Sequence, residues 1–288
     1  MKARTVAATA AALVALAVGS IYSSRALVRA MDDQQEASGL VANLAYWTTV
    51  VPGLVSAEDA ARTRLAVAHY RQREESEMAD LPELQQRAER FQQRVAPWLA
   101  QPPVQADGRL SAVALQAQTQ MLADLVRLPA ETARTALADR LAAWLAQVLD
   151  APASRSSLPA LQQLRTAEAL AMHAARSGHA DAAQHWLEVA RTAVPRPADI
   201  KAHTVENTAR DLLPLHVMLA SCLPGQTPLL APEAQQALAH GYDIRQLRQQ
   251  YTASWDRPLL QLAAQPGTAP ICSQTATRYK ALLVADQP

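Results

Sequence analysis

The amino-acid sequence predicts an all-α protein, and three features of its composition support this class. Half of the residues are apolar and alanine and leucine supply most of them, whereas aromatic residues make up only 4%. Alanine and leucine favour helices, and the residues that favour strands are sparse. Eight glycines in 288 residues are too few for the turns of a β-sandwich or for a glycine-rich nucleotide-binding fold. The expected architecture is an N-terminal transmembrane helix followed by an α-solenoid-like array of helical hairpins.

Positive and negative charges are balanced, with 27 basic and 26 acidic residues and a net charge of +1. Proteins that bind nucleic acid usually carry a basic stripe or tail, because the neutralisation of phosphates dominates their affinity. The sequence has no such stripe, so we expect no nucleic-acid partner. Lys2, Lys201 and Lys280 are the only lysines, and this arginine bias, together with the abundant alanine, indicates a GC-rich bacterial genome.

The N-terminal segment predicts the compartment. Thr5–Ser24 is uncharged and just long enough for a membrane span, which needs about 20 apolar residues. The preceding residues 1–4 contain Lys2 and Arg4, which favours a cytoplasmic start. The alternative is a cleaved signal peptide, because Ala15-Leu16-Ala17 has the small-x-small pattern of a cleavage site. Either reading places the bulk of the chain in the periplasm, and the anchor places it at a bacterial inner membrane with a single span.

Residues 25–56 form a predicted juxtamembrane helical segment. Within it, Ala37–Ser56 is a second charge-free run that Asn43 and Pro52-Gly53 interrupt. We expect it to lie against the domain or the bilayer surface. The alternative is a second span, which would return the C-terminal part to the cytoplasm.

The rest of the chain predicts a helical-repeat domain at 57–221 and a helical, proline-rich C-terminal cap at 222–288. Ser56 caps the first helix and Asp80 precedes the second, whose Pro82 is tolerated in the first turn. Prolines punctuate the helices that follow, and Pro214 is expected to kink its helix. The predicted helices cover 56–79, 80–97, 110–128, 130–150, 158–177, 180–194, 198–221 and 232–253, followed by a proline-broken tail and a short helix at 275–284.

Tryptophan recurs at the helix ends of this domain. RVAPWLAQ at 94–101 is echoed by RLAAWLAQ at 140–147, 46 residues later, and more weakly by AAQHWLEV at 182–189. Each Trp precedes a proline-containing loop, where its ring would cover the end of its own hairpin and pack against the next. The spacing matches a two-helix unit and predicts a helical repeat.

The third unit, LAMHAARSGHADAAQHWLEVARTAVP at 170–195, resembles a tetratricopeptide repeat. Leu170, Gly178, Ala183, Leu187, Ala190 and Pro195 stand where that family places its leucine, inter-helix glycine, small, large apolar, small and terminal proline residues. The chain departs from the pattern at Ala167 and Ala174, which replace large aromatic residues and would leave the first helix thinly packed. The resemblance implies a scaffold or assembly factor whose groove accepts a segment of a partner protein. Polar residues around this hairpin, His173, Arg176 and Gln184, are the predicted partner-binding residues.

The sequence contains no motif for a catalytic nucleophile, nucleotide or redox centre, so we expect neither an enzyme nor a cofactor. His173, His179 and His185 recur every six residues, which does not place them on one helical face, and we expect surface histidines rather than metal ligands. His203 and Glu206 share a face and support an alternative, a periplasmic metal-dependent protein or enzyme. The sequence predicts no particular small-molecule ligand.

Cysteine usage agrees with export. Cys222 and Cys272 are the only two cysteines, and in an oxidising compartment they either pair or remain two buried thiols. The sequence thus predicts an inner-membrane-anchored periplasmic scaffold that binds partner proteins of an envelope complex of the secretion or pilus type.

Overall fold

The computed structural model describes scattered residues between 56 and 65 and the ranges 81–193, 205–239 and 257–284. The chain divides into two compact units, Met1–Glu75 and Ser76–Pro288. In the first unit, Ala57, Ala60, Ala61 and residues 63–65 are helical, in agreement with the expected helix start at Ser56. The predicted span at 5–24 and the run at 37–55 lie outside the described residues. Within the described ranges, no helix has the length and apolar character needed to cross a bilayer.

The described part of the second unit is helical, which confirms the all-α class. It contains no strand, and its one extended contact is an isolated antiparallel bridge between Val104 and Leu110. The helices are α4 (Leu81–Leu99), α5 (Ala112–Leu125), α6 (Thr132–Asp150), α7 (Pro152–Ser156), α8 (Ala160–Arg176), α9 (Ala180–Ala193), α10 (Val205–Ser221), α11 (Ala231–Ala239), α13 (Arg257–Ala263) and α14 (Pro270–Val284).

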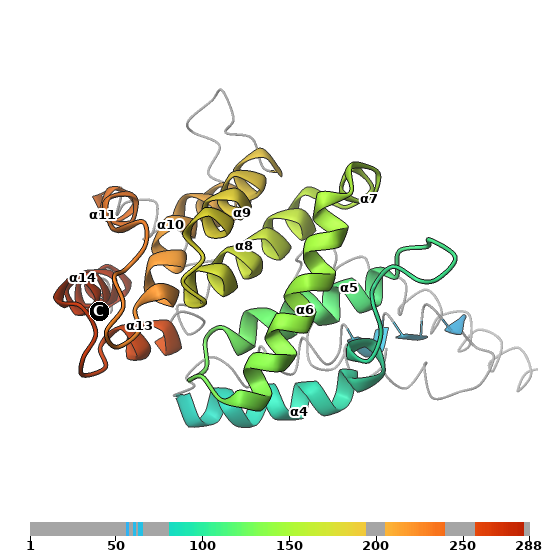
Figure 1. Ribbon diagram of the computed structural model, residues 1–288, viewed down its shortest axis with the longest axis horizontal. Helices are drawn as coiled ribbons and strands as arrows, with labels where there is room; N and C mark the ends of the chain where they lie inside the picture. The colour runs from blue at the N-terminus through green and yellow to red at the C-terminus, as the bar shows by residue number, and fades with distance from the viewer. Residues whose placement is uncertain are drawn as a thin grey trace, which may run out of the picture. The chain divides into compact units, whose positions relative to one another are not determined.

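Successive helices of this unit pack as neighbouring hairpins (Figure 1). Helix α5 lies between α4 and α6, and both α5 and α6 contact α8. Helix α8 pairs with α9, both of these contact α10, and α10 pairs with α11. Each hairpin therefore buries the apolar face of the next one.

Helix α8 is enclosed within this array, since α5, α6, α9 and α10 all contact it. The expectation that alanines would leave it thinly packed is wrong. Ala167 and Ala171 are fully buried and Ala174 is 6% exposed. A side chain that ends at Cβ lets neighbouring helices approach, so the alanines fit the crowded centre where an aromatic ring would not.

The α8–α9 turn depends on Gly178. Its φ is +75°, a left-handed conformation that a residue with Cβ adopts only with strain. The amide of His179 donates to the Ala174 carbonyl at 2.9 Å and that of Gly178 to Ala175 at 3.1 Å. This pair of hydrogen bonds is the Schellman motif, which closes a helix on a glycine. The sequence-predicted role of Gly178 as the inter-helix turn agrees with this geometry.

The C-terminal region differs from the sequence-based prediction. The segment expected to be a proline-broken tail contains α13, and α14 begins at Pro270 instead of near 275. Pro258 and Pro270 stand in first turns, where proline is tolerated because its missing N–H would have no helical partner. Leu259 and Leu262 are buried, so packing stabilises α13. The predicted helix 232–253 is described only as α11, and α10 continues through Pro214.

Helix α13 joins the C-terminal helices to α4. It contacts α4, α10 and α14, and the Gln261 side-chain oxygen accepts a hydrogen bond from the amide of Leu81 at 3.1 Å. In Figure 1, α13 lies between the N-terminal end of α4 and α10. The C-terminal helices therefore pack with the hairpin array in one unit.

A disulfide joins Cys222, at the end of α10, to Cys272 in α14 across 50 residues. The sequence left open whether these two cysteines pair or remain buried thiols, and in the structure they are paired. The adjoining loops are also held by the amide of Gly225, which donates to the Gly267 carbonyl at 3.0 Å. The bridge and this hydrogen bond attach α14 to the core.

Removing the bridge is expected to destabilise the fold. The double substitution Cys222→Ala/Cys272→Ala releases a loop of 50 residues and should lower the free energy of unfolding by about 2–4 kcal/mol, because the unfolded chain regains loop entropy. Denaturant unfolding of the purified chain measures this. Reduction of the unmodified protein should produce a similar loss, and equal stability of all three samples would contradict the prediction.

The crowding around α8 gives a second prediction. Ala171→Leu should lower the free energy of unfolding by about 1–3 kcal/mol, because added methylenes in a filled core force neighbours to move. Ala143→Leu is the matched control, since Ala143 is exposed on α6 and should change stability by less than about 0.5 kcal/mol. An equal response of both variants in thermal or denaturant unfolding would show that α8 has room for larger side chains.

Candidate functional site

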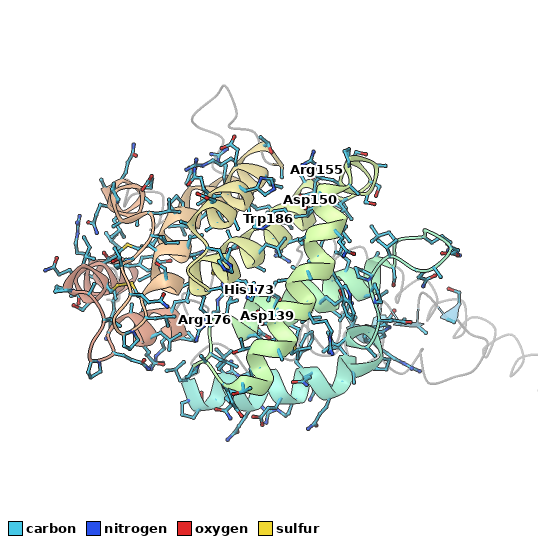
Figure 2. The ribbon with its side chains drawn as sticks, viewed as in Figure 1. Asp139, Asp150, Arg155, His173, Arg176 and Trp186 are labelled. Carbon is cyan, nitrogen blue, oxygen red and sulfur yellow. A yellow bond between two sulfur atoms is a disulfide. The ribbon has the colours of Figure 1, made fainter. Side chains whose placement is uncertain are left out.

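Two of the predicted partner-binding residues, His173 and Arg176, make contacts between helices. His173 and Arg176 lie on the last two turns of α8, beside Asp139 of α6 (Figure 2). His173 Nε2 is 3.3 Å from Asp139 Oδ1, and Arg176 Nη1 donates to the Val126 carbonyl at 2.8 Å. Val126 follows the last turn of α5, where carbonyl groups carry the negative end of the helix dipole. Both side chains thus connect the α8–α9 hairpin to the preceding one.

Burial shifts the pKa of both of these groups. It lowers the pKa of the His173 imidazole from 6.5; the Asp139 carboxylate acts in the opposite sense, and His179 and Arg176 add to the lowering. Burial also lowers the pKa of Arg176. The lowered pKa favours the neutral imidazole of His173 beside the Asp139 carboxylate at pH 7. The expectation of a surface histidine is wrong for His173, whose side chain is 17% exposed.

A second contact of the same kind lies at the C-terminal end of α6. His185 of α9 places Nε2 3.5 Å from Asp150 Oδ1, and its ring meets the Trp186 ring edge to face at 4.6 Å. Asp139 and Asp150 are eleven positions apart, which is about three helical turns, so they share one face of α6. Figure 2 shows Asp139 near His173 and Asp150 near Trp186. Helix α6 is therefore connected to the α8–α9 hairpin near its middle and at its C-terminal end.

The remaining predicted residues belong to α9 or to the core. Gln184 is exposed on α9, and no described contact joins it to His173 or Arg176. The repeat-defining residues Leu170, Ala183, Leu187 and Ala190 are buried, whereas Pro195 lies outside the described residues. The three side chains predicted to line a groove are thus divided between a helix junction and an exposed helix face.

The tryptophans of the three echoes differ in their environments. Trp98 is half-buried at the end of α4, and its carbonyl accepts a hydrogen bond from the Gln118 side chain at 2.8 Å. Trp144 is half-buried within α6, six residues before its end. Trp186 is buried in the middle of α9. The idea of one shared packing role at the ends of the hairpins is therefore not supported for Trp144 and Trp186.

The alternative metal-dependent site stays a prediction. His203 lies outside the described residues, and the side chain of Glu206, on the first turn of α10, is likewise not described. Among the described side chains, no group of three histidines, cysteines or carboxylates lies close enough to hold a metal ion.

A buried histidine–carboxylate contact, which the sequence analysis missed, joins α8 and α10. His216 Nδ1 lies 2.7 Å from Glu168 Oε1, and their side chains are 1% and 13% exposed. Such a pair has the groups of a general base and its orienting carboxylate, but here it lies between two packed helices. Its sequence signal is a histidine within the apolar run LLPLHVMLA at 212–220. We assign it to positioning α10 against α8.

An open groove between α4 and α6 is the second feature that the sequence analysis missed. Its volume is about 310 Å³, and its lining residues are Gln92, Arg134, Ala136, Leu137 and Arg140. Arg134 pairs with Glu131 at 2.6 Å, and the Arg140 guanidinium carbon lies 5.5 Å from the centre of the Trp144 ring. Arg140 and Trp144 are four residues apart, so this cation–π pair was visible as a helical spacing.

Comparison of the chain with protein-family models, with curated proteins and with solved structures found no match. The tetratricopeptide resemblance therefore stays a prediction. The groove and the helix-joining contacts are the features on which a functional interpretation can be based.

The lowered pKa of His173 predicts acid sensitivity. A group whose pKa is lower in the fold than in the unfolded chain stabilises the fold fully above the unfolded pKa, and this stabilisation is lost as pH falls below it. The free energy of unfolding should therefore decrease as pH falls below 6.5. His173→Gln should weaken this decrease, because glutamine is polar and of similar size but does not titrate.

The control is His185→Gln, because the side chain of His185 is 54% exposed and remains in water on folding. Thermal unfolding of both variants and the unmodified chain between pH 7.5 and 5 makes the comparison. A pH profile that is the same for His173→Gln as for the unmodified chain would contradict the assignment.

Proposed function

We propose that the protein is a scaffold or assembly factor of the bacterial envelope, held at the inner membrane by Thr5–Ser24 and binding partner proteins through a periplasmic array of helical hairpins. The observation that carries this proposal is the order of contacts from α4 to α11, in which each hairpin packs on the next. Helical-repeat proteins are built in this way, and their extended surfaces typically bind other proteins.

The order of contacts resembles an α-solenoid. With α4 as the second helix of one hairpin, α5 and α6, α8 and α9, and α10 and α11 form the following three. The first helices, α5, α8 and α10, contact one another in series, and each second helix contacts the first helix of the next hairpin. This arrangement supports the tetratricopeptide-like reading of residues 162–195.

The disulfide supports an exported location. Disulfides persist in oxidising compartments, including the bacterial periplasm, and are rare in the reducing cytosol. The N-terminal charge pattern, Lys2 and Arg4 before a long apolar run, agrees with this orientation.

A reporter fused after Pro288 tests the orientation. Alkaline phosphatase, which folds only after export, should be active there, whereas a green fluorescent protein fusion should be dark when exported through the general secretion route. The converse result would place the helical domain in the cytoplasm. A fusion after Asp33 serves as the control, because the proposed orientation of Thr5–Ser24 puts it in the periplasm with or without a second span at 37–56.

The binding function needs a separate test. Chemical cross-linking of intact cells, followed by purification of the chain from membranes, should yield one or a few proteins in stoichiometric amounts. A chain that purifies alone and contains stoichiometric zinc or iron would instead support the metal-dependent alternative at His203 and Glu206.

A further inference from the structure

The first helices of the hairpins offer little surface to a partner. Between Val113 and Leu128, which includes most of α5, only Gln116, Gln120 and Ala123 are more than marginally accessible. In α10, every residue from Leu212 to Ser221 is buried. A partner must therefore meet the second helices or the loops, and α4 and α6 form the described groove on that side.

The groove combines two cations with apolar side chains. Leu137 and Ala136 line it from α6, and Gln92 lines it from α4. Arg134 is held in place by Glu131 at 2.6 Å and by the Pro129 carbonyl at 3.4 Å. At about 310 Å³, the groove is at the small end of ligand sites, which suits one or two side chains of a partner.

The positive charge of Arg140 has no acidic partner among the described residues. None of the hydrogen bonds or ion pairs found in the described ranges involves Arg140, whose contact is with the ring of Trp144. That contact uses none of the five guanidinium N–H donors, which are suited to bind a carboxylate through two hydrogen bonds. The half-buried Trp144 ring also extends the apolar surface along α6.

We propose that the α4–α6 groove binds an acidic segment of a partner protein, with an apolar side chain against Leu137 and carboxylates paired with Arg140 and Arg134. The proposal rests on the proposed scaffold function and adds the surface and the chemistry of the partner. Charge complementarity selects this occupant, because a basic or uncharged segment would leave the Arg140 cation unpaired.

Three labelled peptides of twelve residues test the chemistry with the purified full-length chain. One carries four acidic residues around a leucine, the second replaces each acid by lysine, and the third replaces the leucine by serine. Fluorescence anisotropy should show the acidic leucine peptide binding at least about tenfold more tightly than the lysine peptide. Its affinity should fall as salt rises, because the contacts are exposed charges. Equal binding of the acidic and lysine peptides would overturn the proposal.

Variants locate the site. Arg140→Glu should weaken binding of the acidic leucine peptide by about tenfold or more, and Arg140→Gln should weaken it less. Lys280→Glu is the matched control, because it makes the same charge change at an exposed position of α14. Equal weakening by Arg140→Glu and Lys280→Glu would show attraction by overall charge alone and would overturn the site. Unchanged thermal unfolding of Arg140→Gln separates loss of binding from loss of folding.

A competition measurement distinguishes a segment from a small acid. Free glutamate and citrate should displace the acidic leucine peptide only at concentrations far above the peptide's own dissociation constant. The serine peptide should bind several-fold more weakly than its leucine counterpart. Displacement by citrate at micromolar concentration, with no preference for leucine, would place a small carboxylate in the groove and overturn the proposal.

Photo-cross-linking in cells separates this proposal from the scaffold function. A photoreactive residue in place of Ala136, exposed on the groove wall, should cross-link to an acidic segment of the captured partner. If Arg140→Glu still captures that partner in full, the groove is refuted and the scaffold function stands. If no partner is captured but the purified chain binds the acidic peptide selectively, the scaffold function fails and the groove stands.

Discussion

The enclosure of α8 by four helices is the constraint on which the described core depends. The neighbouring helices contact α8 largely at its alanine residues, of which Ala167, Ala169 and Ala171 are fully buried. An alanine side chain removes far less apolar surface from water than a leucine does. The stabilising burial must therefore come from larger residues on the surrounding helices, such as Leu115, Leu141 and Leu187, all 1% exposed or less. Alanine permits the close approach, and the neighbours supply the apolar area.

Directional polar contacts supplement this alanine-rich packing. The Thr166 hydroxyl donates to the Gln162 carbonyl at 2.8 Å, so the Thr119 hydroxyl must be the donor in the 3.0 Å contact between the two threonines. The Gln162 side chain donates to both hydroxyl oxygens. This network fixes α5 against α8, as the His216–Glu168 contact fixes α10 against α8. Hydrophobic contact is non-directional, whereas these bonds specify how far one helix is shifted along another.

The elements that could be predicted from the sequence are those that depend on residues close together in the chain. Glycine and proline act within a few residues, so the turn at Gly178 and the helices at 132–150 and 160–176 lie close to where the sequence placed them. The helix at 257–263 depends on burial of Leu259 and Leu262 by other elements, and no local pattern reports that. The contact of His216 with Glu168 joins residues 48 positions apart. The α4–α6 groove likewise depends on how two helices lie, although the Arg140–Trp144 spacing was readable in advance.

The placement of His173 and Arg176 also changes where a partner is expected to bind. The tetratricopeptide resemblance implied a groove that accepts a partner, and His173 and Arg176 were predicted to bind it because they are polar residues of the best-matched hairpin. Both of them, however, join α8 to the preceding hairpin, so their substitution would weaken the array itself. Helix α6 is arranged differently. Asp139 and Asp150 connect it to the α8–α9 hairpin, while Leu137 and Arg140 line the open groove beside α4. The same helix is thus fixed to the array through its acids and presents cationic and apolar side chains to the groove, which makes it a rigid element on which a binding surface can be held.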